Sequence, residues 1–140
     1  MKQSIPLPIL SEAIMFYKII VKILRILVFI VFDLRIYNED RINKTNGPLI
    51  VCGNHTSMWD PVILAVSSKR QIHFMGKKEL FDHKILGFFY KKLGAFPVDR
   101  DSGALSSIRN SLKVLKSNEV LGIFPEGTRV KKYDENSAKP

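Results

Sequence analysis

Residues 46–66 read NGPLIVCGNHTSMWDPVILAV and show how the chain is built. The turn signal Asn46-Gly47-Pro48 precedes a short apolar run at residues 49–52, which predicts a buried β-strand. A polar loop follows, and the apolar stretch at 61–66 predicts a helix, since Asp60 stands before a proline suited to the first helical turn. A strand that leads through a polar loop into a helix is the repeating unit of α/β folds.

The same alternation continues as far as residue 124. Further strands are expected at residues 72–75, 95–98 and 120–124, and helices at residues 84–92 and 104–116. In the last helix one face is made of Leu105, Ile108, Leu112 and Leu115. The pattern predicts an α/β domain at residues 34–140, with a mostly parallel sheet and flanking helices.

A different pattern occupies the amino-terminal end. Residues 14–32 contain sixteen apolar residues and three cations, Lys18, Lys22 and Arg25. On a helix the cations form a narrow stripe, and the remaining apolar arc is too wide for a small soluble domain to cover. Because the charge-free runs are too short to span a bilayer, residues 1–33 are expected to form a membrane-interfacial helix, with Ser11 as its N-cap. The alternative is a helix buried against the rest of the domain.

The charge and the cysteine content limit the kinds of partner that the protein can have. The 140 residues carry 22 Lys+Arg against 13 Asp+Glu, a net charge of +9. This excess favours an anionic partner such as a membrane surface, a nucleic acid or a phosphorylated substrate. No nucleic acid is expected, because no recognised DNA-binding or base-stacking pattern accompanies the charge. The single cysteine, Cys52, excludes an internal disulfide, fits a reducing compartment and is expected in the core.

His55 and Asp60 lie between the first strand and its helix. Functional groups of parallel α/β sheets gather where strands end and helices begin. His55 is a candidate general base, and Asp60, five residues on, could accept a hydrogen bond from its other ring nitrogen. The alternative role for Asp60 is a simple helix N-cap. Neither His73 nor His83 has an Asp at the same spacing.

Residues 124–129, Phe-Pro-Glu-Gly-Thr-Arg, follow the last strand. These groups suit a polyol phosphate, with Arg129 on the phosphate and Glu126 and Thr128 on hydroxyls. Taken alone, the segment is better interpreted as a polar turn. No metal site is indicated, because the histidines are scattered and no Cys/His cluster exists.

Together these segments resemble the glycerolipid acyltransferase family. The matching stretches are Asn54-His55 with Asp60, then Gly94-Ala95-Phe96-Pro97-Val98-Asp99-Arg100, then Phe124 to Arg129, with Lys77-Lys78-Glu79-Leu80 similar to a lysine-x-Glu-Leu stretch of the family. The resemblance covers residues 34 to 129, and the order of the three main blocks makes it specific.

The resemblance implies direct acyl transfer without an acyl-enzyme. His55 would deprotonate the free hydroxyl of a lysophospholipid, which attacks the thioester of acyl-CoA or acyl carrier protein, and Asp60 would orient His55. The implied substrate-binding residues are Arg100, Glu126, Gly127, Thr128, Arg129 and Lys77, with the two arginines on the glycerol phosphate. For Lys77 a solvated Lys-Lys pair is the alternative.

The implied acceptor is the sn-2 hydroxyl of 1-acyl-glycerol 3-phosphate, which gives phosphatidic acid. No cofactor is expected, since acyl-CoA or acyl carrier protein is a substrate, and the expected location is the cytoplasmic face of a membrane, among membrane lipids. Two alternatives stay open: an acyltransferase for glycerol 3-phosphate or another lysophospholipid, and a non-catalytic basic peripheral membrane protein. The family continues beyond its third motif, so the α/β domain is expected to be incomplete at Pro140.

Overall fold

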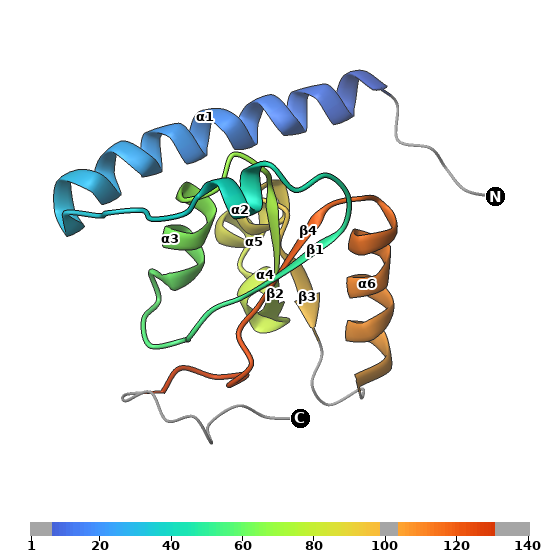
Figure 1. The fold of residues 1–140 in the computed structure, drawn as a ribbon. Coiled ribbons are helices and arrows are strands. Elements are labelled where there is room, and N and C mark those ends of the chain that lie inside the picture. Colours follow the sequence, from blue (N-terminus) through green and yellow to red (C-terminus); the bar gives the residue numbers. More distant parts are fainter. Residues whose placement is uncertain (1–6, 99–103, 131–140) are drawn as a thin grey trace.

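The computed structural model describes residues 7–98 and 104–130 (Figure 1). Its elements are α1 (Leu7–Phe32), α2 (Asp40–Asn43), β1 (Leu49–Cys52), α3 (Asp60–Val66), β2 (Ile72–Lys77), α4 (Glu79–Asp82), α5 (Lys84–Lys92), β3 (Phe96–Val98), α6 (Ala104–Lys116) and β4 (Val120–Ile123). The predicted alternation of strands and helices is confirmed. The short helices α2 and α4 had no counterpart in the sequence analysis.

The four strands form one parallel sheet in the order β1-β4-β2-β3. The last strand in sequence, β4, therefore lies inside the sheet, with Leu49 and Ile72 both opposite Val120. Val120 and Leu121 are buried, as expected for a strand with neighbours on both sides. Because all strands run the same way, their carboxyl ends meet at one edge of the sheet, at the bottom of Figure 1.

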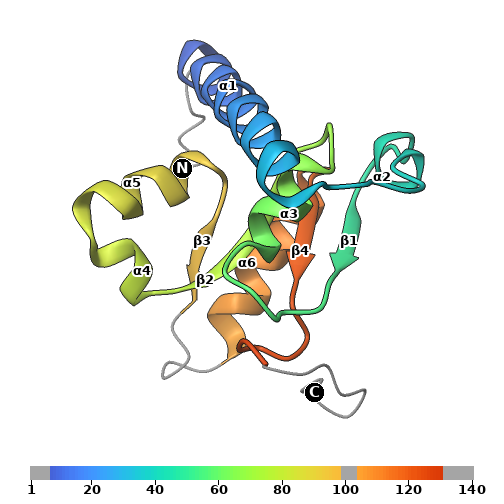
Figure 2. The same cartoon turned by 90° about the vertical axis from the view of Figure 1, so that its left-hand side faces the viewer.

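Helices cover both faces of the sheet. On one face α6 contacts β3 and β4, and on the other α3 and α4 contact β2. Figure 2 shows α3 in front of the sheet, α6 behind it, and α4 and α5 beside its β3 edge. The long helix α1 lies across α3 and also contacts α5. The predicted α/β class with flanking helices is confirmed.

The helix α1 begins earlier than expected. It starts at Leu7, so Ser11 lies inside the helix and its expected role as N-cap is wrong. The reason is Pro8, which fits the first helical turn because the backbone N–H it lacks would have no partner there. None of the helices among the described residues is long and apolar enough to cross a membrane.

One side of α1 is part of the core. Tyr17, Val21 and Val28 pack with Val66 of α3. Away from this side, exposed apolar residues follow one another along the helix, including Ile19, Ile23, Ile26 and Ile30. The two interpretations of this helix therefore each describe one of its sides, and its position in a membrane interface stays a prediction.

Burial differs from expectation at β1 and α6. Cys52 is exposed and Ile50 is 49% exposed, so the expectation of a buried strand with a core cysteine is wrong. The cause is topological, because β1 is an edge strand that pairs only with β4. On α6 the residues Leu105, Ile108 and Leu112 are exposed, while Ser111 contacts Met75 of β2. The helix thus turns its apolar stripe away from the sheet.

Candidate active site

Two loops meet at the carboxyl edge of the sheet. The loop that carries His55 follows β1, and the loop that carries Glu126 follows β4. These strands are neighbours, and their pairing is extended by a hydrogen bond from the Gly53 N–H to the Ile123 carbonyl at 3.1 Å. Residues far apart in sequence are therefore brought together by strand pairing.

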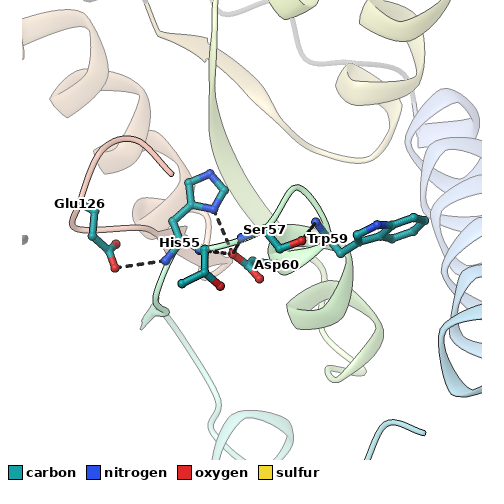
Figure 3. Close-up of polar contacts among 6 residues, drawn as sticks. His55, Ser57, Trp59, Asp60 and Glu126 are labelled. Atoms are coloured by element: carbon teal, nitrogen blue, oxygen red, sulfur yellow. Dashed lines mark hydrogen bonds and ion pairs between the residues drawn. The ribbon is translucent and has the colours of Figure 1, made fainter. Parts of the chain in front are cut away.

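The Asp60 carboxylate holds the His55 ring. The distance from His55 Nδ1 to Asp60 Oδ2 is 3.2 Å (Figure 3). The same Oδ2 accepts hydrogen bonds of 2.7 Å from the backbone N–H groups of Thr56 and Ser57. The N-cap of α3 is Trp59, and the Asp60 side chain folds back over the loop that precedes the helix, so the simple N-cap alternative is wrong. One carboxylate thus orients both the imidazole and its loop.

Aromatic stacking restrains the other degrees of freedom of the ring. His55 stacks on Phe124 with 4.4 Å between ring centroids, and Phe124 stacks on Phe74 at 5.8 Å. Gly122 makes room for this stack, because a Cβ there would lie 2.4 Å from the Phe74 ring. With Nδ1 facing Asp60, the second ring nitrogen, Nε2, points away from the carboxylate in Figure 3.

Glu126 holds the main chain of His55. Its side chain is only 2% exposed, and Oε1 accepts a hydrogen bond from the His55 N–H at 3.1 Å. The backbone N–H of Val130 donates to the His55 carbonyl at 2.8 Å. Oε2 of Glu126 is buried and has no hydrogen-bond partner among the described residues. Sequence reasoning placed Glu126 on a substrate hydroxyl and missed the contact with His55, for which sequence spacing offers no signal.

The other predicted substrate-binding residues are spread over the same edge. Gly127 has a φ of +65° in the turn after Glu126. Thr128 and Arg129 follow it with exposed side chains, and Lys77 is exposed at the end of β2. Arg100 lies outside the described residues. Within residues 7–98 and 104–130, no group of three or more His, Cys, Asp or Glu side chains is placed to hold a metal ion.

Comparison with known proteins places the chain in a family. A family model described as "Acyltransferase" matches residues 33–139. The chain belongs to this acyltransferase family. The family resemblance inferred from the motifs is thereby confirmed, and the acyltransferase match contains both loops that meet around His55.

Curated relatives carry a more specific name. A 1-acyl-sn-glycerol-3-phosphate acyltransferase of Bacillus subtilis is 40% identical over 114 residues, which cover 81% of this chain and 57% of the relative. Proteins of the same name from Streptococcus pneumoniae and Helicobacter pylori are 40% identical over 95 residues and 34% identical over 104 residues. These alignments cover 66% and 71% of this chain, and 36% and 44% of the relatives. The chain thus spans between about a third and somewhat more than half of these acyltransferases. No solved structure matches the chain.

Proposed function

We propose that this acyltransferase chain carries the catalytic base for acylation of the sn-2 hydroxyl of 1-acyl-sn-glycerol 3-phosphate, which gives phosphatidic acid. The observation that carries the proposal is the His55–Asp60 pair, whose histidine is held through its ring by Asp60 and through its main chain by Glu126. The names of the curated relatives support the choice of acceptor. The acyl donor is acyl-CoA or acyl carrier protein.

The geometry supports His55 as a general base. A carboxylate can only accept hydrogen bonds, so the ring nitrogen that faces Asp60 carries the proton and Nε2 keeps its lone pair. Nε2 takes the proton of the acceptor hydroxyl while the oxygen attacks the thioester carbon. The C–S bond then breaks, and the imidazolium returns the proton to the leaving thiolate. Asp60 stabilises the imidazolium between these two steps.

The same geometry favours direct transfer over an acyl-enzyme. An acyl-enzyme needs a nucleophile that the base can deprotonate. Of the hydroxyl side chains nearest in sequence, Ser57 accepts a hydrogen bond from the Trp59 N–H at 3.2 Å, and Thr56 is exposed. The single thiol, Cys52, belongs to β1 and lies before the loop.

Acceptor binding is assigned mainly to the loop after β4, together with Lys77 at the end of β2 and Arg100 after β3 in sequence. Arg129 and Arg100 bind the phosphate, while Glu126, Gly127 and Thr128 shape the glycerol site and Lys77 contacts the phosphate or the oxyanion. Support comes from the exposure of Thr128 and Arg129 a few residues beyond Glu126, which itself touches His55. A guanidinium offers a bidentate fork to phosphate, which a lone ammonium does not.

A membrane location follows from the acceptor and from α1. A lysolipid resides in a bilayer, and α1 exposes a long apolar side that an interface would cover. We place the domain on the cytoplasmic face, in agreement with a single unpaired cysteine.

The test is a mass-spectrometric assay of acyl transfer in lipid vesicles, with the full-length gene product. Wild type should convert lysophosphatidic acid to phosphatidic acid with acyl-CoA or acyl carrier protein, and His55→Ala should not. Transfer to glycerol 3-phosphate instead would replace the acceptor and keep the mechanism. Absence of transfer to every acceptor would favour the non-catalytic peripheral membrane protein.

A further inference from the structure

The helix α5 exposes an apolar side, on which the Lys92 ammonium lies over the Phe88 ring at 5.7 Å. Ile85 is 65% exposed, Phe88 54% and Phe89 39%. The opposite side of α5 is tightly docked, since a Cβ on Gly87 would lie 2.3 Å from the Phe81 carbonyl oxygen of α4. The apolar side chains therefore point outward from a helix whose orientation is set by close packing.

This apolar side continues the exposed side of α1. The rings of Phe16 on α1 and Phe89 on α5 are in contact, with centroids 6.0 Å apart. Figure 2 shows the two helices next to each other on the same side of the molecule. We call the joint surface the α1–α5 surface, and its exposed members include Ile19, Ile23, Ile30, Ile85, Phe88 and Phe89.

Cations border the α1–α5 surface on both sides. On α1 the side chains of Lys18, Lys22 and Arg25 share one stripe, and Arg25 pairs with Glu39 at 3.8 Å, so this stripe faces away from α5 and toward the segment before α2. On α5, Lys84 and Lys91 are exposed and, being seven residues apart, share the side away from α1. An apolar strip between two cationic borders is the arrangement of helices that lie in a bilayer interface, where the cations reach the lipid phosphates.

We propose that the α1–α5 surface rests on an anionic lipid bilayer, with α5 as a second membrane-contacting helix beside α1. Charge favours this occupant over a second copy of the chain, because like-charged borders would face each other between two copies. A bilayer is planar, so contact through α1 and α5 leaves α6 behind the sheet and away from the lipid (Figure 2). The exposed apolar stripe of α6 therefore serves as a control surface that should not contact the bilayer.

The proposal goes beyond acyl transfer, since it assigns a membrane-contact surface whatever the chemistry of the site. It also bears on the site, because α1 reaches the His55 loop at its carboxyl end. Phe32 contacts Trp59 with centroids 5.5 Å apart, and Trp59 points toward α1 in Figure 3. A domain held through the α1–α5 surface would keep this loop near the source of a lipid acceptor.

A fluorophore on α5 tests the contact directly. In a Cys52→Ser background, Ile85→Cys is labelled with a polarity-sensitive dye, and Leu105→Cys on α6, where Leu105 is 77% exposed, is the matched control. With phosphatidylglycerol/phosphatidylcholine vesicles the emission at position 85 should shift to shorter wavelength, and the emission at position 105 should not. No shift at 85 in vesicle-bound protein, or equal shifts at both positions, would overturn the proposal. A shift that grows with protein concentration without vesicles would also overturn it and indicate contact between copies.

Charge insertion gives a second measurement that does not depend on a label. Ile85→Glu with Phe88→Glu places two carboxylates on α5, and Leu105→Glu with Ile108→Glu places two on α6 at the same spacing. Vesicle co-sedimentation should weaken about tenfold or more for the α5 pair, which is about 1.4 kcal/mol, and little for the α6 pair. Equal binding by folded versions of both pairs would contradict the proposal. Neither assay reads out acyl transfer, so failure here leaves the proposed function standing.

Discussion

Glu126 Oε1 accepts a hydrogen bond from the backbone N–H of His55 at 3.1 Å, across 71 residues of sequence. The contact depends on the pairing of β1 with β4, which places the two loops side by side. Because the Val130 N–H also donates to the His55 carbonyl, the main chain of His55 is held at both of its polar groups. The segment after β4 therefore positions the residue that we propose as the base, in addition to the role in acceptor binding that we propose for the same segment.

The first prediction concerns this positioning. Glu126→Gln keeps an oxygen acceptor for the His55 N–H, whereas Glu126→Ala removes it. Since a small displacement of a catalytic group can cost about 100-fold, Glu126→Ala should lower kcat by about 10- to 100-fold, and Glu126→Gln by much less. The loss of kcat reports the role through His55, and a rise in KM for the lysolipid beside it would report the additional role in shaping the glycerol site.

The control for this comparison is Glu79→Gln with Glu79→Ala, at an exposed position on α4. Steady-state kinetics would be measured after thermal melting confirms that each variant is folded. A rise in KM without loss of kcat would assign Glu126 to acceptor binding alone and refute its role in positioning His55.

The second prediction concerns phosphate recognition by Arg129 and Arg100. Arg129→Lys and Arg100→Lys should each lower kcat/KM for the phosphorylated acceptor, because lysine keeps the charge and loses the bidentate fork. A charge-assisted contact of about 1.5–3 kcal/mol corresponds to a loss of roughly 10- to 150-fold. Arg109→Lys, at an exposed position on α6, is the control. Unchanged acceptor kinetics in both single variants would refute the assignment.

The third prediction concerns the cationic stripe of α1. Lys18→Glu with Lys22→Glu should weaken binding to anionic vesicles, and the loss should be larger at low salt, because screening limits attraction to a charged surface. Arg25→Glu should have an additional effect on folding, since Arg25 pairs with Glu39 and lies over the Phe29 ring at 5.7 Å. Co-sedimentation across a salt series, with neutral vesicles as control, provides the measurement. Equal binding to anionic and neutral vesicles by wild type would show that the stripe is not used.

Deletion of residues 1–32 is a less direct test of membrane binding. Residues Tyr17, Val21 and Val28 pack with Val66, so removal of α1 also exposes part of the core. Release of the truncated protein from vesicles would then mix loss of contact with loss of structure.

Local signals explain why several elements were predicted with the right bounds. The turn at Asn46-Gly47-Pro48 marks the start of β1, and Gly94, with a φ of +85°, lies just beyond the end of α5. Such residues act within a few positions of themselves and can be interpreted without the fold. The burial of a side chain cannot be predicted from such local signals. Cys52 is an example, because its exposure depends on the strand order, in which β1 is at the edge of the sheet.

The candidate site also has one contact that the sequence could predict and one that it could not. His55 and Asp60 are five residues apart, so their hydrogen bond is local and the spacing predicted it. The contact between Glu126 and His55 needs β4 beside β1, an arrangement that no local pattern encodes. The side that α6 turns toward the sheet could not be predicted either, since its periodic apolar stripe faces away from the sheet.

The fourth prediction concerns stability at high pH. Burial raises the pKa of the Tyr17 phenol above its usual value. A folded-state pKa above that of the unfolded chain means that this contribution to stability is complete below about pH 10 and is lost as the pH rises further. Wild type should therefore lose more free energy of unfolding above about pH 10 than Tyr17→Phe. Urea denaturation at pH 7 and pH 11 measures this, with Tyr37→Phe, at a 76% exposed position, as control. The same pH dependence in all three proteins would contradict it.

The fifth prediction concerns the chemical step. A lipid hydroxyl is a poor nucleophile near neutral pH, so a base must take its proton as the bond to the thioester carbon forms. Removal of a general base costs about 10²- to 10⁴-fold, and His55→Ala should lose roughly 3–5.5 kcal/mol of transition-state stabilisation. Asp82→Asn, on the exposed part of α4, controls for the loss of a carboxylate elsewhere.

Asp60→Asn keeps the shape of the side chain and removes its negative charge. Because the same Oδ2 faces His55 Nδ1 and the N–H groups of Thr56 and Ser57, an asparagine oxygen in its place would accept from all three, and the imidazolium would lose the carboxylate that stabilises it. Asp60→Asn should therefore lower acyl transfer strongly, and the double variant should be little worse than His55→Ala alone, because the two residues act as one unit. Acyl transfer would be measured for both single variants and the double variant once each is shown to be folded. Fully additive losses would mean that Asp60 serves the loop and not the histidine, and wild-type turnover by His55→Ala would remove the mechanism.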